Sequence, residues 1–399
     1  MNTDHRYVVV GCGGLGSAAL YWLARAAGSR EGAVLGLEAH HLGHDRGASQ
    51  DHSRIIRYAQ HEDAYAALAP AAYDTWHDVE RVSGQQLVVE TGGLVIEDMD
   101  DGRAHLDTGS RNMDGYRAVA ARHGVALEEL DAKGVANRWP QFRLAGTEQA
   151  LYQRRSGIVD ARRANATHVA LARGHGAHVE QDSPVRALHP TRDGVEVVTD
   201  DEVYRAEQVV VTADARTNEV LAGVGRELPL TVLQEQVTYY ATPNLLAFAP
   251  ENFPVFMWHG ADNFYGFPVY GEVATKLGQH MGGHEVTADS RTFEADPLRR
   301  KRQEEFLAEH LPGFGGPELY TKTCLYTIPP DQHFVIDTVP EAPNVHVAVG
   351  AGHAFKFASL IGRILAELAT AGRSRHPIDT FSLDRPALLD PGFERRFHV

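Results

Sequence analysis

Cysteine and lysine are scarce in this 399-residue sequence, which has two cysteines, Cys12 and Cys324, and five lysines among its 38 basic residues. Two cysteines in so long a chain give no disulfide framework, which favours a reducing, cytoplasmic compartment. A strand pattern begins within the first seven residues and leaves no room for a signal peptide. No apolar run approaches the roughly 20 residues that a bilayer crossing needs. We therefore expect no membrane partner.

Positive charge is in the minority: 38 basic residues stand against 53 acidic ones, for a net charge of −15. This balance argues against nucleic acid and anionic membranes as partners. A hydrophobic content of 43% supports ordinary globular folding, and the length exceeds that of a single core. We expect two domains that share a cleft for small molecules, in a monomer or small homo-oligomer.

The N-terminal segment has the pattern of a dinucleotide-binding βαβ unit. An apolar run over residues 7–10 leads into a glycine-rich loop and a helical apolar spacing, and a second apolar run over 33–37 ends at an acid. In such units the glycines make a tight turn, let the backbone approach a pyrophosphate and let the helix pack on the strand, while the acid meets a ribose hydroxyl. The pattern leaves open which dinucleotide binds. The residues predicted to bind it are Gly11, Gly13, Gly14, Gly16 and Glu38.

The rest of the chain alternates between helical and strand patterns and predicts a discontinuous first domain. A nucleotide-binding domain is expected over residues 1–86, 155–222 and 320–399, and a β-rich substrate domain over 87–154 and 223–319. A helix with an apolar face over 360–368 should end at Gly372. Strands are predicted at 86–90 and 93–96, both in the second sheet, and at 195–198, 208–212, 236–241, 255–258, 264–268 and 345–349.

A second glycine-rich segment, over residues 347–356, repeats the order of strand, glycines and helix start. A helix start at the same cleft would place a positive dipole end near a negatively charged group there. The alternative is a glycine-rich turn into a packing helix.

Several motifs occur in the order seen in the family of monomeric sarcosine oxidase and N-methyltryptophan oxidase, and the chain resembles this family over nearly its whole length. The resemblance implies an α/β fold with a Rossmann-like FAD-binding domain and a second β-rich substrate domain, as in D-amino-acid oxidase. The motifs are the 11–16 loop with Glu38, Ser53-Arg54-Ile55-Ile56-Arg57, Arg138-Trp139-Pro140, Tyr265-Gly266-Phe267-Pro268, Lys276-Leu277-Gly278-Gln279-His280, Thr323-Cys324-Leu325-Tyr326-Thr327, His333-Phe334-Val335-Ile336-Asp337 and Gly352-His353-Ala354-Phe355-Lys356-Phe357.

The resemblance also implies roles for individual residues. Cys324 would form a thioether to the flavin, since a thiolate is nucleophilic enough to add to its 8-methyl position. Arg57 and Lys356 would bind the substrate carboxylate, Arg54 would favour the anionic reduced ring and Lys276 would assist the reaction with oxygen. Tyr265, His280 and His353 would shape the active-site cavity or bias the protonation of the amine. The remaining residues implied to contact the cofactor are Ser53, Gly352 and again Lys356.

Two segments depart from the family pattern. Residues 49–53 lack the expected His-Gly-Asp-Thr, and residues 211–216 lack the expected Gly-Ala-Trp. Residues 234–237 and 258–259 also differ from the sarcosine pattern, so a larger or cyclic amino acid is given equal weight as substrate. Histidines at 40, 41 and 44, and at 175 and 178, have no nearby third ligand of fixed geometry, and we expect no metal site.

The predicted function is an FAD-dependent oxidase of a secondary amino acid, N-methyl or cyclic, which yields an imine and hydrogen peroxide from substrate and dioxygen. One alternative is an FAD-dependent amino acid dehydrogenase with another electron acceptor. A second is a flavin-binding protein without catalysis, and a third is a nicotinamide-dependent dehydrogenase, which would leave the late cysteine and helix motifs unexplained.

Overall fold

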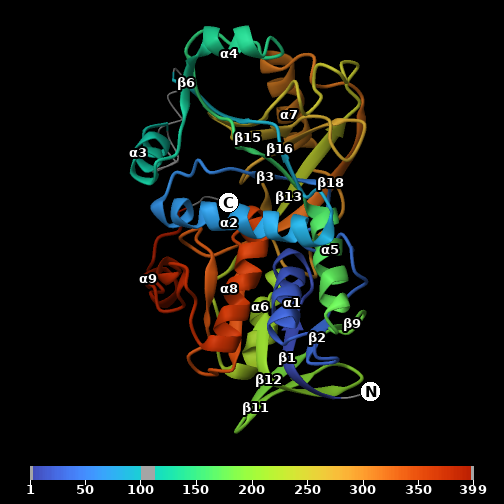
Figure 1. Cartoon of the computed structure of the whole chain (residues 1–399). Helices are drawn as coiled ribbons and strands as arrows, with labels where there is room; N and C mark the ends of the chain where they lie inside the picture. Colours follow the sequence, from blue (N-terminus) through green and yellow to red (C-terminus); the bar gives the residue numbers. More distant parts are fainter. Residues whose placement is uncertain (1–2, 100–112, 397–399) are drawn as a thin grey trace.

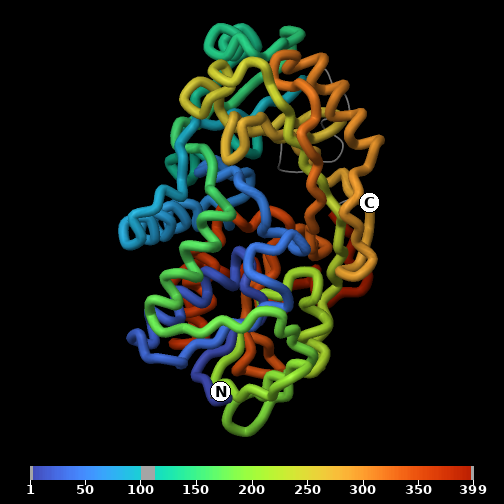
Figure 2. Tube along the Cα trace, turned by 90° about the vertical axis from the view of Figure 1, so that its right-hand side faces the viewer, coloured from blue at the N-terminus to red at the C-terminus, as the bar shows by residue number. Residues whose placement is uncertain are grey.

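The computed structural model describes residues 3–99 and 113–396, in which two large β-sheets lie at opposite ends of an elongated molecule. Figure 1 shows α1, α5 and α8 beside the first sheet, and α2 between this part and the second sheet. The turned view of Figure 2 shows the same division. The α-helices of the described residues are α1 (Gly14–Ala26), α2 (Asp63–Ser83), α3 (Met113–His123), α4 (Ala132–Arg138), α5 (Ala161–Gly174), α6 (Thr217–Leu221), α7 (Pro297–His310), α8 (Ala358–Ala371) and α9 (Pro386–Leu389).

The first sheet has eight strands in the order β10-β11-β12-β1-β2-β9, with β20 beside β12 and β19 beside β20. The strands β9, β2, β1, β12 and β20 run parallel, so their carboxyl ends meet at one edge, where ligands of such sheets bind. The strands are β1 (Asp4–Val10), β2 (Val34–Leu37), β9 (His178–Glu180), β10 (Ala187–Thr191), β11 (Gly194–Val198), β12 (Val203–Val211), β19 (Val335–Thr338) and β20 (Val345–Val349).

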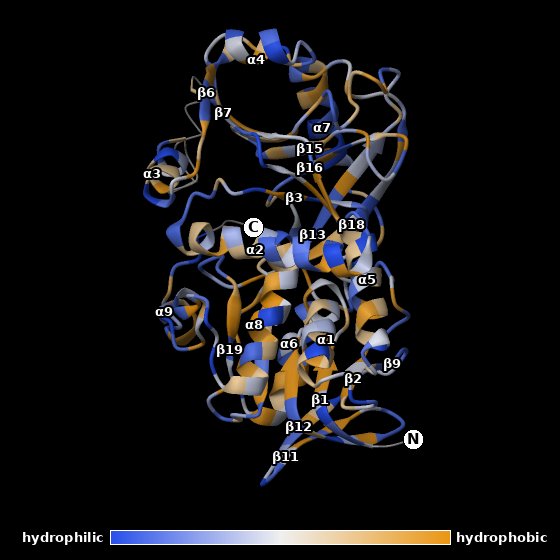
Figure 3. Ribbon diagram, viewed as in Figure 1, coloured by the Kyte–Doolittle hydropathy of each residue, from blue (hydrophilic) through white to orange (hydrophobic). Residues whose placement is uncertain are grey.

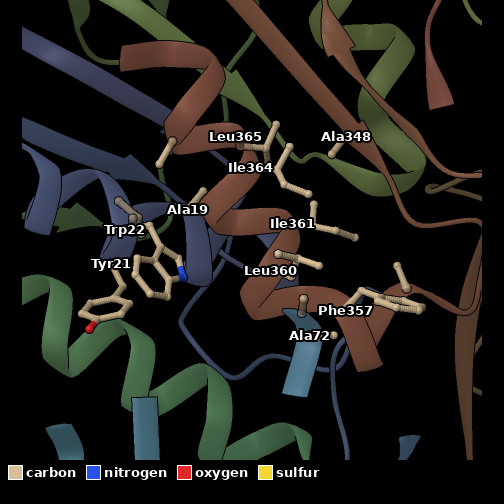
Figure 4. Packing of buried hydrophobic residues seen from close by; sticks show 14 of the residues in the cluster. Ala19, Tyr21, Trp22, Ala72, Ala348, Phe357, Leu360, Ile361, Ile364 and Leu365 are labelled. Atoms are coloured by element: carbon tan, nitrogen blue, oxygen red, sulfur yellow. The ribbon is translucent and has the colours of Figure 1, made fainter. Parts of the chain in front are cut away.

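Helices α1 and α8 pack on each other and cover one face of this sheet. The apolar side chains of α8 recur at helical spacing and belong to one core cluster with residues of α1 and the sheet; Figure 4 shows Leu360, Ile361 and Ile364 in this cluster. A Cβ on Gly362 would lie 2.5 Å from Ala18, so only glycine permits this close crossing of the two helices. In Figure 3 hydrophobic colour is correspondingly concentrated on β1, β12 and α8.

The second sheet has nine strands in the order β17-β13-β16-β15-β14-β5-β7-β6, with β18 beside β13. Its core is rich in phenylalanine and includes residues of α7. The strands are β5 (Gly93–Asp98), β6 (Glu128–Asp131), β7 (Glu148–Gln153), β13 (Thr231–Tyr240), β14 (Val255–His259), β15 (Phe264–Phe267), β16 (Thr275–Gln279), β17 (His284–Val286) and β18 (Glu318–Ile328).

A three-stranded sheet of β3 (Ser53–Ile56), β8 (Gly157–Asp160) and β4 (Val88–Glu90) completes the described sheets. Short 3-10 helices form η1 (Asp214–Arg216), η2 (Ala222–Val224), η3 (Ala354–Phe357) and η4 (Asp379–Phe381). No helix of the described residues is long and apolar enough to span a membrane.

The predicted α/β class, the parallel sheet and the second β-rich sheet are confirmed. The placement of residues 86–90 in the second sheet is wrong, because β4 pairs with β8 in the three-stranded sheet while β5 joins the second one. The structure also differs from the predicted helix start after Gly352. The 3-10 helix η3 follows the glycines, and the α-helix α8 begins only at Ala358. As predicted, α8 ends at Gly372, whose φ of +69° is in the left-handed region that favours glycine.

Candidate active site

A cavity of about 1620 Å³ extends from the glycine-rich loop after β1 to residues of the second sheet. It is lined by residues that are far apart in the sequence and that the family motifs single out. The predicted site residues on its wall are Gly11, Gly13, Gly14, Glu38, Ser53, Arg54, Arg57, Tyr265, Lys276, His280, Cys324, Gly352, His353 and Lys356.

Gly16 alone among the predicted site residues is not on the cavity wall. A Cβ at this position would lie 1.8 Å from the Gly11 carbonyl oxygen, which shows why the packing of α1 against the loop needs glycine. Gly11 itself has a φ of +84°, and a Cβ there would lie 2.6 Å from the carbonyl oxygen of Thr212. The loop therefore turns tightly from β1 into α1, whose first residues Gly14 and Leu15 line the cavity.

Glu38, at the end of β2, is buried beside this loop. Its carboxylate accepts hydrogen bonds from the amide nitrogens of Cys12, at 2.8 Å, and His40, at 3.2 Å, and lies 3.2 Å from Nε2 of His44. Burial raises the pKa of Glu38, but the bonds from His44 and the Cys12 amide outweigh it and hold this pKa below its usual value. An ionised acceptor thus stands at the position where the βαβ pattern predicts a ribose contact.

Three segments converge where α1 begins. The amide of Gly14 donates a 2.8 Å hydrogen bond to Oγ of Ser49, and a Cβ on Gly14 would lie 2.8 Å from the Phe355 ring. Arg54 fixes the same segment by donating to the carbonyl oxygens of Ala48, at 2.9 Å, and Gln50, at 2.6 Å. A glycine cradle closed by such neighbours, with Glu38 beside it and a long cavity beyond, fits a dinucleotide.

Lys276 on β16 is buried in the cavity wall. Its ammonium lies 2.6 Å from Oδ2 of Asp51 and donates to the carbonyl oxygen of Ser53, at 2.9 Å, and to Oγ of Ser53, at 3.2 Å. Burial lowers the pKa of Lys276 to about 8, although the Asp51 carboxylate opposes that shift. Lys276, the lysine predicted to assist the oxygen reaction, therefore forms an ion pair with Asp51.

Cys324 lies on β18, opposite Glu235 of β13. Burial raises the pKa of the Cys324 thiol to about 11, and the nearby Arg54 cation opposes this. Both cysteines are free. Cys12 is buried next to Gly36, where a Cβ would lie 2.9 Å from its sulfur.

The two predicted carboxylate-binding cations line the same cavity. The Arg57 guanidinium donates to the carbonyl oxygen of Ala59, at 2.9 Å, and to the Tyr116 hydroxyl, at 2.7 Å. The Lys356 ammonium donates to the carbonyl oxygen of His353, at 2.6 Å, while the indole of Trp76 in α2 donates to the Lys356 carbonyl oxygen. Helix α2 therefore anchors the turn that carries Lys356.

The remaining predicted residues frame the cavity with rings. The His280 ring lies 5.9 Å from that of Tyr326, and the His353 ring lies 4.7 Å from that of Phe334. Burial raises the pKa of Tyr265, which keeps its hydroxyl protonated. All three residues line the cavity.

Sequence reasoning missed several residues of the site. Asp51, Tyr116, Tyr326 and Ser49 all line the cavity, yet only Tyr326 lies within a quoted motif, and it was given no role. Ser49 and Asp51 lie within residues 49–53, where the sequence departs from the family pattern, and this departure was the signal that could have found them. Within the described residues, no group of three or more potential metal ligands is found.

A parallel sheet with a glycine cradle and an acid, joined to a β-rich part over one cavity, is the arrangement of a dinucleotide-binding protein of two parts. The family model described as FAD dependent oxidoreductase matches residues 6–368. The chain belongs to this family, and FAD is its cofactor.

Two relatives match nearly the whole chain. Monomeric sarcosine oxidase of Streptomyces avermitilis is 34% identical, over 97% of this chain and 99% of its own length. N-methyl-L-tryptophan oxidase of Escherichia coli is 30% identical, over 95% of this chain and 98% of its own. The solved structure of NikD, described as an unusual amino acid oxidase essential for nikkomycin biosynthesis, superimposes with a TM-score of 0.83 at 27% identity, covering 96% of this chain and 98% of the other. The family resemblance inferred from the motifs is confirmed.

Proposed function

We propose that this protein oxidises a secondary amino acid, N-methyl or cyclic, to the imine and passes the electrons to dioxygen, which leaves as hydrogen peroxide. The observation that carries the proposal is that Arg57 and Lys356 share one cavity with the FAD cradle and with Lys276. A protein that only stored a flavin would not need two cations for a carboxylate there. The names of the sarcosine and N-methyl-L-tryptophan oxidases support the substrate class.

The chain's own residues supply the binding of the cofactor. The loop over 11–14 and the N-terminal amides of α1 would hold the pyrophosphate, and Glu38 would accept from a ribose hydroxyl. When bound, FAD takes two electrons and two protons from the C–N unit of the amine and delivers them to dioxygen. The overall change converts one amine and one dioxygen into one imine and one hydrogen peroxide, and the imine then hydrolyses in water.

Arg57 and Lys356 would fix the substrate by its carboxylate. A guanidinium offers two parallel donors, whereas an ammonium adds a compact charge, so together they set both position and orientation. Arg57 already uses one nitrogen on Ala59 and Tyr116, which holds the rest of its planar group in place. The amine must arrive with its lone pair free, because an ammonium cannot release electrons from the adjacent carbon.

Lys276 would assist the second half of the reaction. Transfer of an electron to dioxygen creates negative charge, and a fixed cation in a poorly solvated wall lowers the energy of that charge. This supports oxygen, rather than another acceptor, as the oxidant.

The cavity favours a substrate larger than sarcosine. Aromatic and histidine side chains from α3 and β14 line it, namely Tyr116, Trp258 and His259. Trp258 and His259 are positions where the sequence departs from the sarcosine pattern. N-methyl aromatic or cyclic amino acids therefore have a complementary wall.

We further propose that Cys324 bonds to the flavin. Its sulfur would replace one hydrogen of the 8-methyl group, and the two electrons released would reduce dioxygen to hydrogen peroxide. The position of Cys324 on the cavity wall supports this, and the Arg54 cation opposes the rise of its pKa that burial causes. The two free cysteines also support a cytoplasmic location.

The two-part division is likewise proposed, with residues 1–86, 155–222 and 320–399 binding FAD and 87–154 and 223–319 facing the substrate. The two large sheets support it for most strands. The division and the sheets disagree at β18, which begins at Glu318. The division assigns most of this strand to the FAD-binding part, whereas the strand pairs with β13 of the second sheet.

The proposed function is tested by incubating the purified holoprotein with a panel of N-methyl and cyclic amino acids while measuring peroxide. Catalase-treated samples serve as the control for the signal. We expect peroxide from at least one member in equal amount to the oxygen consumed. Absence of peroxide with the whole panel, from protein that contains flavin, would contradict the proposal.

A further inference from the structure

The ammonium of Lys276 lies among oxygen atoms of two residues, Asp51 and Ser53. Its nitrogen forms an ion pair with Oδ2 of Asp51 at 2.6 Å and donates hydrogen bonds to the carbonyl oxygen of Ser53, at 2.9 Å, and to Oγ of Ser53, at 3.2 Å. The side chains of Lys276 and Asp51 are only 2% and 3% exposed. The lysine is therefore fixed as one half of a buried ion pair.

Asp51 is held in place independently of Lys276. Its second carboxylate oxygen accepts a hydrogen bond from the Tyr239 hydroxyl, and Arg54 lies 3.7 Å from Oδ2. The backbone of Asp51 has a φ of +83°, a region that residues other than glycine rarely adopt. Such a conformation persists only where the surroundings impose it, often at functional sites.

The second sheet sets the position of Lys276. In the sheet register Lys276 lies opposite Tyr239 on one side and Phe267 on the other. Its ammonium lies 4.6 Å from the centre of the Phe267 ring and 5.8 Å from that of Tyr239. These rings exclude water, so a charge here depends on its protein neighbours.

The charged and titratable groups that face Lys276 come from three segments. Asp51 lies just before β3 and Arg54 lies in it. Tyr239 lies on β13, and Cys324 lies on β18. Asp51 favours the ammonium, whereas burial and the Arg54 cation favour the neutral amine. Asp51 is therefore the principal partner that stabilises the charge.

We propose that Asp51 is a positioning residue for the oxygen reaction: its carboxylate, fixed by Tyr239, holds Lys276 in the cavity wall as an ammonium. The inference rests on the proposed function, because it takes Lys276 as the residue that assists oxygen. The opposing possibility is that the carboxylate screens the lysine and slows the reaction. The two ideas predict changes of opposite sign when the carboxylate is neutralised.

The test is Asp51→Asn, which keeps the shape of the side chain and suits a positive φ. Two rates are followed separately by flavin absorption. The first is the reduction of the holoprotein by substrate without oxygen, and the second is the reaction of the reduced holoprotein with oxygen. At pH 8 we expect the oxygen step to slow by about tenfold or more, with the pH at which it is lost moving to lower values. Anaerobic reduction should change less than about twofold. Tyr239→Phe should act in the same direction but more weakly.

A second measurement, the midpoint potential of the bound flavin at about pH 7, where the Lys276 ammonium predominates, does not depend on turnover. If Lys276 becomes neutral in Asp51→Asn, the pair keeps zero net charge and the potential stays level or falls. A higher potential, or a faster oxygen reaction, would show that the lysine stays charged and would overturn the proposal. An unchanged pH profile in both variants would also overturn it.

Lys276→Met separates this inference from the proposed function. If that variant reacts normally with oxygen, the role proposed for Lys276 is wrong. If it reacts slowly while Asp51→Asn and Tyr239→Phe react like the unsubstituted protein, only the role of Asp51 is wrong.

Discussion

The Arg57 guanidinium donates a 2.7 Å hydrogen bond to the Tyr116 hydroxyl, and its central carbon lies 5.2 Å from the centre of the Tyr116 ring. Tyr116 lies on α3, so a helix of the second part of the molecule orients a cation carried by the segment after β3. The bond prevents the guanidinium from rotating. It leaves the other nitrogens of Arg57 for a ligand.

Tyr116→Phe should raise the KM for the amino acid about fivefold, as expected for the loss of a hydrogen bond worth about 1 kcal/mol. The ring contact with Arg57 is kept, so kcat should change little. Steady-state kinetics check this. Tyr204→Phe, in the core beneath the first sheet, is the matched control. An unchanged KM in Tyr116→Phe would show that Arg57 needs no support from α3.

Lys356→Ala should weaken the binding of carboxylated amines by about tenfold or more, because one of two charged partners is lost. An amine of the same shape without the carboxylate should be affected much less. The comparison of the two ligands by their KM values isolates the charge interaction. Equal losses for both amines would place the carboxylate elsewhere.

Cys324→Ser should give protein whose FAD is released by acid precipitation, since the serine hydroxyl is far less nucleophilic than a thiolate. The unsubstituted protein should keep its yellow colour in the precipitate. Cys12→Ala, which removes the other cysteine, is the control and should behave like the unsubstituted chain. Acid-stable colour in Cys324→Ser would show that the attachment site is a different residue.

Lys276→Met should slow the oxygen reaction about a hundredfold while anaerobic reduction changes far less, because the cation acts only where charge develops on oxygen. Rapid mixing of each half-reaction measures the two effects. Lys301→Met removes a lysine whose side chain is 71% exposed and should leave both unchanged. Equal losses in the two half-reactions would contradict the assigned role.

The two half-reactions should depend on pH with opposite sign. Burial lowers the pKa of Lys276 to about 8, so its ammonium is present below that pH and is lost above it, and the oxygen reaction should decline as the pH rises through 8. Reduction by substrate should rise with pH as the bound amine loses its proton. Stopped-flow measurements from pH 6 to 10 check both. A reduction rate that is flat across the ionisation of the amine would contradict the need for a free lone pair.

Local patterns were enough to predict the cradle of Gly11–Gly16 with Glu38, because strand, turn and helix there are consecutive in the chain. Lys276 and Cys324 were found only through the family motifs. Their strands, β16 and β18, were not among those predicted, since β16 is buried throughout yet contains threonine, lysine and glutamine, and so lacks an apolar pattern.

Partners that meet only in the folded chain could not be predicted. Tyr239 and Asp51 are 188 residues apart, and Tyr116 and Arg57 are 59 apart. Nothing local in the sequence marks such pairs. The departure at residues 49–53 pointed to a changed site but not to the ion pair with Lys276.

The central claim is that FAD and an amino acid would bind in one cavity, whose cations select the amino acid by its carboxylate. It is tested most directly by titrating the purified holoprotein with N-methyl and cyclic amino acids without oxygen, while recording the flavin absorption band. The account predicts that at least one of them bleaches the band and that oxygen restores it. Protein that takes up no flavin, or a band that no carboxylated amine bleaches, would contradict it.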